Sequence, residues 1–301
     1  MGIASKLTSA SAPGRPSGRT QQAWTEFWKD PAQSHCVAGA SDIQLALSNH
    51  WATFAQCLAS GTRVLDLGCG AGAVARLLLN ARSQIHVTGI DFARIPLAMS
   101  ENVELLSETA MESLPFGAGS FGAAVSQFGF EYSQLADTVR ELERVLAPGA
   151  KISFLVHHAD SAIVRTNRSR LAALEGFLAP DMRSAFCAAD VAAFQAQLAA
   201  LVQAHPDDAL VVELARALPS RLGREPRERS AIWNAVEDAL APERCLAEAL
   251  NACCVSRARL EEWLDPLRAV SGVTSVSILR ERDGSPVAWK IDGLRETPSS
   301  P

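Results

Sequence analysis

The segment of this sequence best suited to bind a small ligand is a glycine-rich turn flanked by two aspartates. The stretch VLDLGCGAG covers residues 64–72 and contains Gly68, Gly70 and Gly72. Glycine lets a backbone approach a ligand closely and adopt positive φ, and a helix that begins after such a turn offers free N–H groups. Asp91 ends the next apolar run, roughly 20 residues on, where a carboxylate can accept hydrogen bonds from two ribose hydroxyls.

Two kinds of ligand fit this turn. Gly68, Gly70 and Ala73 also satisfy the pattern G-x-G-x-x-G/A of nicotinamide dinucleotide sites. Asp66, at the end of the preceding apolar run, favours a different ligand, because a carboxylate repels a pyrophosphate and attracts a positive amino group. S-adenosylmethionine (SAM) carries such an amino group. A nicotinamide oxidoreductase stays open as a less favoured alternative.

Candidate catalytic side chains come later in the chain. His157 and His158 follow a predicted strand, and either is a candidate base for removing a proton from an acceptor. Glu131 and Tyr132 follow the strand before it and are candidate substrate contacts. A structural role is the competing interpretation for all four residues.

Apolar runs that alternate with helical patterns predict the elements that position these residues. We expect strands at residues 63–67, 85–90, 103–106, 121–126 and 151–156, with helices at 73–80, 93–100 and 135–146 between them. A strong hairpin signal, Asp283-Gly284, joins predicted strands 273–280 and 286–291. The sequence therefore predicts an α/β fold: a Rossmann-like, doubly wound, mostly parallel seven-stranded sheet with a C-terminal β-hairpin and an α-helical insertion after strand five.

Four regions follow from this pattern. We expect a disordered tail over 1–20, a ligand-binding core with N-terminal helices over 21–157, a helical insertion serving as lid or substrate region over 158–256, and a last core helix with the closing hairpin over 257–301. One N-terminal helix carries Trp24, Phe27 and Trp28 at helical spacing, and a second starts at Ser41 or Asp42. For Arg165, Arg168 and Arg170 a solvated helix face is favoured over contact with an anionic substrate.

Composition excludes several function classes. The 301 residues carry a net charge of -5, which disfavours a nucleic-acid partner. No run of 18 apolar residues lacks charges, so we expect no membrane span. The seven cysteines have no zinc-site spacing, which predicts no metal site and reduced thiols in a cytoplasmic protein. Adjacent Cys253 and Cys254 are expected to be small core residues on a helix.

Five motifs of the sequence resemble those of a known family. The motifs VLDLGCGAG (64–72), GID (89–91), MESLPF (111–116), SFGAAVSQFGFEY (120–132) and RVLAPGAKISF (144–154) are similar, in order and spacing, to those of class I SAM-dependent methyltransferases of the ubiquinone/menaquinone-biosynthesis type. The resemblance implies SAM as cofactor and methyl transfer to an oxygen, carbon or nitrogen atom of a small molecule. It leaves the acceptor and the oligomeric state open.

The resemblance also implies roles for individual residues. Gly68, Gly70 and Gly72 would line the methionine and ribose part of SAM, and Asp66 would face its amino group. Asp91 would hold the ribose hydroxyls. The remaining implied cofactor contacts are Phe92 against adenine, Met111 and Glu112 at the adenine edge, and Ser126 and Gln127 through backbone oxygen near the amino group.

One position departs from the family pattern. Where many relatives carry an aspartate two residues before the glutamate, this chain has Ala110, so Glu112 or backbone must serve the adenine amine. This departure favours, mildly, the alternative of a non-catalytic methyltransferase-like subunit. A methyltransferase that acts on a protein is a further alternative, because such enzymes share the same core.

Overall fold

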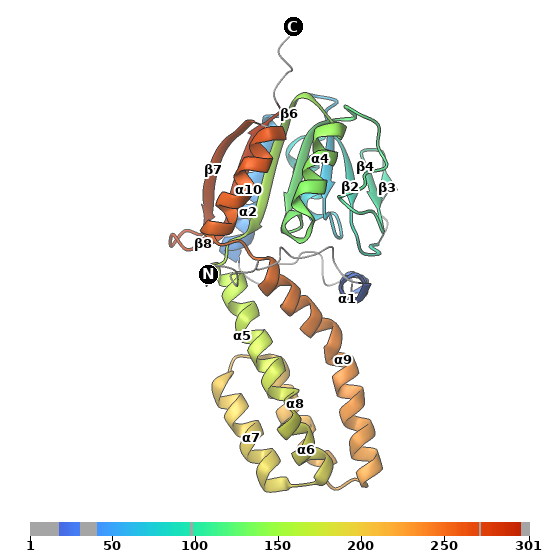
Figure 1. Ribbon diagram of the computed structural model, residues 1–301, viewed down its shortest axis with the longest axis vertical. Coiled ribbons are helices and arrows are strands. Elements are labelled where there is room, and N and C mark those ends of the chain that lie inside the picture. Colours follow the sequence, from blue (N-terminus) through green and yellow to red (C-terminus); the bar gives the residue numbers. More distant parts are fainter. Residues whose placement is uncertain (1–17, 31–40, 97–98, 271, 296–301) are drawn as a thin grey trace, which may run out of the picture. The chain divides into compact units, whose positions relative to one another are not determined.

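The computed structural model describes residues 18–30, 41–96, 99–270 and 272–295 (Figure 1). The chain divides into two compact units. One, called here the sheet unit, comprises Met1–Val164 and Ala252–Pro301; the other, the helical unit, comprises Arg165–Asn251. Residues 1–17 of the predicted tail lie outside the described residues, whereas residues 18–20 belong to the first helix.

The sheet unit is built on eight strands. They are β1 (Arg63–Leu67), β2 (His86–Ile90), β3 (Met99–Ser100), β4 (Val103–Leu106), β5 (Phe121–Gln127), β6 (Leu146–His157), β7 (Gly272–Arg280) and β8 (Pro286–Leu294). Their order in the sheet is β3-β4-β2-β1-β5-β6-β8-β7. Strands β4, β2, β1, β5 and β6 pair in parallel, while β8 is antiparallel to both β6 and β7. The predicted mostly parallel sheet with a closing hairpin is confirmed: all seven predicted strands are present, and the two-residue strand β3 adds an eighth at the edge.

Both faces of the sheet are covered by helices, which explains why its strands read as continuous apolar runs. Helices α4 (Leu135–Val145) and α10 (Arg257–Val270) lie on one face with the buried cluster that contains Phe154. Helices α2 (Ser41–Gln56) and α3 (Ala73–Ala81) share the other cluster, which contains Trp51. Side chains alternate between the faces along β6, where Phe154 enters the first cluster and Leu155 the second.

One predicted helix is wrong. Residues 93–96 are not helical, and the short edge strand β3 occupies the end of the predicted segment 93–100. Ser107 binds Ile95 instead: its Oγ accepts from the Ile95 N–H at 3.0 Å and lies 3.3 Å from the Ile95 carbonyl. Pro96 follows and has no N–H for a helical hydrogen bond. Tertiary contacts with the segment after β4 therefore outweigh the local helical pattern.

The helical unit is held by its own core. Its elements are α5 (Ala162–Phe177), α6 (Pro180–Ala188), α7 (Val191–Ala204), α8 (Ala209–Ala217), the 3-10 turn η2 (Pro219–Arg221) and α9 (Pro226–Cys253). Asp190 and Asp208 cap α7 and α8 through side-chain oxygens. Trp233 is fully buried at the centre and stacks on Phe177, with ring centroids 5.2 Å apart.

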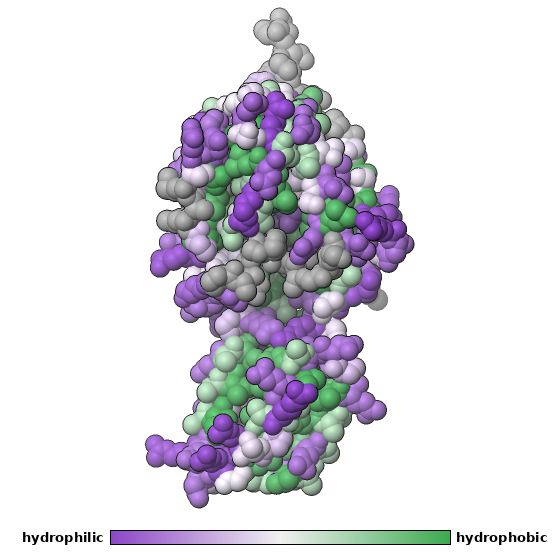
Figure 2. Space-filling model, turned by 180° about the vertical axis from the view of Figure 1, so that it is seen from behind, coloured by the Kyte–Doolittle hydropathy of each residue, from purple (hydrophilic) through white to green (hydrophobic). Residues whose placement is uncertain are grey.

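No disulfide forms between the described cysteines, and Cys36 lies outside the described residues. Cys253 is buried at the end of α9, whereas Cys254 follows the helix and is half-buried. Within the described residues, no helix has the length and hydrophobicity needed to cross a membrane. Figure 2 shows hydrophilic and hydrophobic residues interleaved over the face in view.

Candidate functional site

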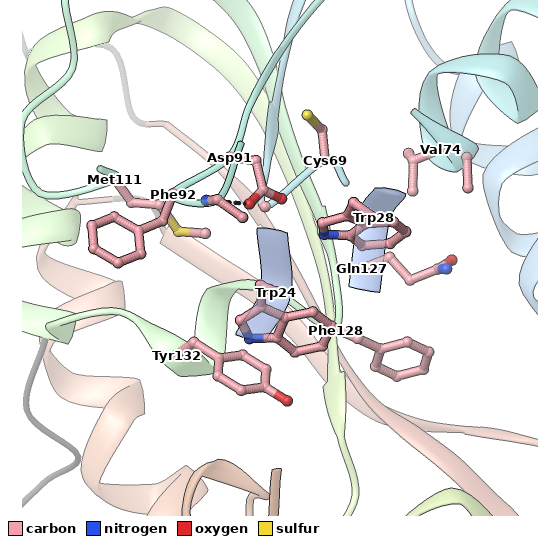
Figure 3. Close-up of a pocket in the computed structure, with 14 residues that line it drawn as sticks. Trp24, Trp28, Cys69, Val74, Asp91, Phe92, Met111, Gln127, Phe128 and Tyr132 are labelled. Atoms are coloured by element: carbon pink, nitrogen blue, oxygen red, sulfur yellow. Dashed lines mark hydrogen bonds between the residues drawn. The ribbon is translucent and has the colours of Figure 1, made fainter. Parts of the chain in front are cut away.

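One pocket of the sheet unit lies at the carboxyl ends of β1, β2 and β5, where parallel α/β sheets bind ligands (Figure 3). Its empty volume of about 750 Å³, which includes space open to solvent, is in the range of small-molecule sites. Five of the predicted cofactor contacts line it: Gly68, Asp91, Phe92, Met111 and Gln127. The other predicted cofactor contacts are not among the residues that line this pocket. The further lining residues are Trp24, Trp28, Cys69, Ala73, Val74, Ala93, Phe128, Gly129 and Tyr132.

The glycine turn needs glycine at each of its three positions. Gly68, Gly70 and Gly72 have φ of 68°, 50° and 77°, a region that side chains disfavour. A Cβ on Gly68 would lie 2.9 Å from the Cα of Gly129, so β1 and the segment after β5 meet here in close backbone contact. Gly72 precedes α3 directly, which leaves the helix N-terminus beside the pocket.

Asp91 organises the turn from the end of β2. Its Oδ2 accepts from the Gly70 N–H at 2.8 Å, and its Oδ1 accepts from the Ala93 N–H at 2.9 Å (dashed line in Figure 3). Burial raises the pKa of Asp91 to about 6, against the lowering effect of these two hydrogen bonds. The carboxylate faces the pocket and keeps lone pairs for further donors, since each oxygen can accept more than one hydrogen bond.

Asp66 is a buried acid on β1 whose side chain has no hydrogen-bond partner among the described residues. It lies near the end of the strand and is fully buried. Burial, with a smaller contribution from the charge of Asp91, raises the pKa of Asp66 to about 8. A buried unpaired acid costs stability unless a ligand satisfies it, so Asp66 fits a cofactor that brings a positive amino group to the glycine turn.

Of the two residues predicted to lie at the edge of adenine, Met111 and Glu112, only Met111 lines the pocket. Oε1 of Glu112 instead accepts from the backbone N–H of Gln134 at 2.8 Å. The loop that carries both residues is fixed from α4, because Oε2 of Glu141 accepts from the Leu114 N–H at 2.6 Å. Glu112 therefore also serves to anchor α4 at its start.

Residues at the end of β5 combine structural and pocket roles. Ser126 is fully buried, and its Oγ donates to the Leu67 carbonyl at 2.7 Å, which ties β5 to β1. Gln127 lines the pocket and accepts from Trp51 Nε1 at 2.7 Å. Phe128 has φ of 60°, a conformation that bulky residues rarely adopt and that marks functional segments.

The two candidate bases have different surroundings. His157, at the end of β6, is buried, and its Nδ1 lies 2.7 Å from Oε1 of Glu131. The same oxygen accepts from the His157 backbone N–H at 2.8 Å. Because a carboxylate oxygen accepts, Nδ1 carries a hydrogen, and in the neutral imidazole Nε2 is then the nitrogen with the lone pair. The pocket residue Phe128 stacks on this imidazole with centroids 4.2 Å apart.

His158 is engaged in local structure. Its Nδ1 accepts from the Asp160 N–H at 3.0 Å, and its ring stacks on Trp289 at 4.4 Å. Burial lowers the pKa of His158. Among the arginines of the helical unit, Arg170 pairs with Asp208 and Glu243, which is an internal contact of that unit.

Several residues that line the pocket were not predicted as ligand contacts, and the largest of them are Trp24 and Trp28. Trp24 and Trp28 come from α1 (Gly18–Lys29), far from the glycine turn in the sequence. Their spacing predicted a helix, but nothing in it predicted where the helix docks. The available signal was the concentration of three aromatic residues, completed by Phe27, in a chain with only 6% aromatic residues.

Comparisons with known proteins agree with this geometry. Residues 65–154 match the family model described as a methyltransferase domain. The demethylmenaquinone methyltransferase of Thermus thermophilus is 35% identical over 102 residues, which are 31% of this chain and 46% of that protein. The 2-phytyl-1,4-naphtoquinone methyltransferase of Synechococcus elongatus is 30% identical over 164 residues, which are 50% of this chain and 70% of the relative.

A solved structure supports the fold. The Burkholderia thailandensis 1,6-didemethyltoxoflavin-N1-methyltransferase, solved with 1,6-didemethyltoxoflavin and S-adenosylhomocysteine, aligns with a TM-score of 0.51 at 10% identity. The alignment covers 96% of this chain and 93% of that one. At this identity the likeness concerns the fold alone. By contrast, the match to the Thermus relative spans less than half of that protein's length.

Proposed function

Because the chain belongs to the class I SAM-dependent methyltransferases, we propose that it transfers a methyl group from SAM to an oxygen, carbon or nitrogen atom of a small molecule. The observation that carries this proposal is the unpaired carboxyl group of Asp66 on β1, the strand that leads into a glycine turn whose first residue, Gly68, lines a pocket. Family membership disfavours the nicotinamide alternative. Quinone precursors are the acceptors named for the similar Thermus and Synechococcus proteins, and we propose an acceptor of that general size and aromatic character.

In this proposal the residues of the turn divide the work of holding the cofactor. Asp66 pairs with its amino group, and Asp91 accepts from its ribose hydroxyls. Phe92 and Met111 pack against adenine, while Gly68, Gly70 and Gly72 allow the backbone to approach. Bound SAM supplies an activated methyl group on a sulfonium centre. The protein mainly aligns the acceptor and excludes water.

We assign the base to His157 rather than His158. Glu131 holds the Nδ1–H of His157, so the lone pair on Nε2 is available to take a proton from an acceptor hydroxyl. The ring of His158 is committed to Asp160 and Trp289. Glu131 acts through the imidazole and is a positioning residue.

The cellular location is proposed from the state of the cysteines. Those in the described residues form no disulfide, which fits a reducing compartment, and we propose the cytoplasm. The proposed role of residues 158–256 as a lid or substrate region stays a prediction.

The test is a calorimetric titration of the full chain with SAM and with its product S-adenosylhomocysteine (SAH), beside Asp91→Ala. We expect micromolar binding that the variant weakens tenfold or more, which corresponds to about 1.4 kcal/mol. Absence of binding to the unaltered protein would overturn the proposal. SAM binding without methyl transfer to any of a panel of hydroxylated naphthalenes, phenols, amines and proteins would favour the non-catalytic subunit.

A further inference from the structure

The first described helix forms one wall of the proposed cofactor pocket. Trp24 and Trp28 of α1 line the pocket, and Figure 3 shows both indoles among the side chains that surround Asp91. A Cβ on Gly70 would lie 2.3 Å from Cζ2 of Trp28, so this ring rests directly on the glycine turn. No residue of α1 belongs to the motifs that define the family resemblance, which begin at residue 64.

We propose that α1 is a part of the cofactor site that closes over SAM. Trp24 and Trp28 pack against the bound cofactor, and α1 must undock from the sheet unit before the product can leave. This inference rests on the proposed function, since it assigns residues to the same cofactor site. The ligand class is an adenosine-containing sulfonium or thioether, namely SAM and SAH.

Two polar contacts dock α1 next to the cofactor residues. Nε2 of Gln21 donates to the Phe92 carbonyl at 2.8 Å, and the Arg94 N–H donates to Oγ1 of Thr25 at 3.1 Å. Both contacts attach to the segment that directly follows Asp91. The helix is therefore tied to the same segment that would hold the ribose and adenine, and its docking is coupled to the shape of the pocket.

Apolar packing adds to these contacts. Trp28 is only 7% exposed and belongs to a buried cluster with Cys69, Ala93 and Leu105. Trp24 stacks on Trp28 with centroids 6.1 Å apart. It also meets Tyr132 edge-on at 5.8 Å, which extends the aromatic wall from α1 to the segment after β5. Trp24 is only half-buried, so its indole is the part of this wall that is open to stack on a flat ring such as adenine.

The first experiment measures SAH affinity by calorimetry for Trp28→Ala and Trp24→Ala in the full chain. We expect each variant to bind SAH at least tenfold more weakly. Glu26→Ala is the matched control on the same helix, because Glu26 is exposed, lies outside the pocket and pairs only with Lys29 among the described residues. We expect its affinity to change by less than twofold.

The second experiment tests undocking without altering the pocket wall. The double variant Gln21→Ala/Thr25→Ala removes both polar docking contacts, and neither side chain lines the pocket. Stopped-flow tryptophan fluorescence follows SAH dissociation, with the indoles of α1 as reporters. We expect the dissociation rate to rise fivefold or more, while Glu26→Ala keeps the rate of the unaltered protein.

The outcomes separate the two proposals. If the unaltered protein does not bind SAH, the proposed function fails. If it binds SAH and Trp28→Ala binds equally well or more tightly, the function stands and α1 does not contact the cofactor. If circular dichroism shows that the tryptophan variants are unfolded, the double variant decides, and an unchanged dissociation rate overturns the inference.

Discussion

The two units of this protein differ in where they place strained backbone and unpaired polar groups. The sheet unit contains all of the described glycines with positive φ, such as Gly70, and also Glu108 and Phe128, whereas the helical unit has one described residue with positive φ, Ala189, which ends α6. The sheet unit also holds Asp66, a buried carboxylate without a partner among the described residues. Such features cost stability and persist where binding or catalysis uses them. Several of them converge on one pocket at the carboxyl edge of the sheet.

The helical unit satisfies its polar groups internally. Arg229 is buried, and its guanidinium donates to the carbonyls of Cys187, Leu222 and Arg224. Arg170 pairs with two acids, and Asp190 caps α7. From this comparison we propose that the cofactor is held by residues of the sheet unit, while the polar contacts named in the helical unit stabilise its own packing. Variants in each unit test this division.

Removing the central side chain of the helical unit should cost stability without changing cofactor affinity. Trp233 is fully buried, so Trp233→Ala should lower the free energy of unfolding by about 3–5 kcal/mol. Urea unfolding measures this loss. Calorimetry with SAH, at a temperature where the variant is folded, should give the affinity of the unaltered protein. A parallel loss of SAH affinity would show that the two units do not divide their roles in this way.

The unpaired acid should make the unliganded protein less stable as pH rises. The pKa of Asp66 is about 8 in the folded state and 3.8 ordinarily, so the unfolded chain releases this proton first. The folded state therefore gains stability from holding the Asp66 proton. This gain is complete below about pH 4 and is lost as pH rises toward 8. For one proton the slope is on the order of 1 kcal/mol per pH unit.

Denaturant unfolding across this pH window measures the slope, and Asp66→Asn should flatten it. Asp91, whose pKa is about 6, adds a smaller contribution between about pH 4 and 6. Asp265→Asn is the control, since that side chain is 89% exposed. A slope that is the same in Asp66→Asn and in the unaltered protein would contradict the assignment.

A matched pair of glycines separates backbone strain from ligand contact within the sheet unit. Gly70 and Gly149 both have positive φ, so alanine at either should cost about 1–2 kcal/mol of stability. Only at Gly70 does the added Cβ meet a neighbour, the ring of Trp28, whereas nothing lies within 4 Å at Gly149. Gly70→Ala should therefore also weaken SAH binding, and Gly149→Ala should not. Equal affinities in the two variants would remove Gly70 and Trp28 from the site.

The smallest effect is expected at a helix cap of the helical unit. Asp190 accepts from the Ala193 N–H at 3.0 Å at the start of α7. Asp190→Ala should cost about 1 kcal/mol in thermal or urea unfolding, with SAH affinity unchanged. Asp181→Ala serves as the comparison, because Asp181 lies in the first turn of α6 but does not occupy its N-cap, and this variant should cost less.

Most strands and helices along the chain could be predicted from the sequence, and so could the edge of the sheet where the ligand residues gather. Apolar runs predicted β1 and β4 with the observed bounds. This works because a parallel sheet buried on both faces demands continuous apolar strands. The turn after β1 was readable because only glycine tolerates its conformation. The helix predicted over 93–100 failed because Asp91 and Ser107 hold that segment from outside its own sequence.

Contacts between side chains that are distant in the sequence could be known only from the tertiary structure. It joined Glu131 to His157, 26 residues apart, and set His158 aside in a local turn. It placed Trp28 on Gly70, and it buried Asp66 without a partner among the described residues. Periodicity reports which face of an element is apolar, but not which other element covers it. These pairings depend on long-range packing, which no short segment of the sequence encodes.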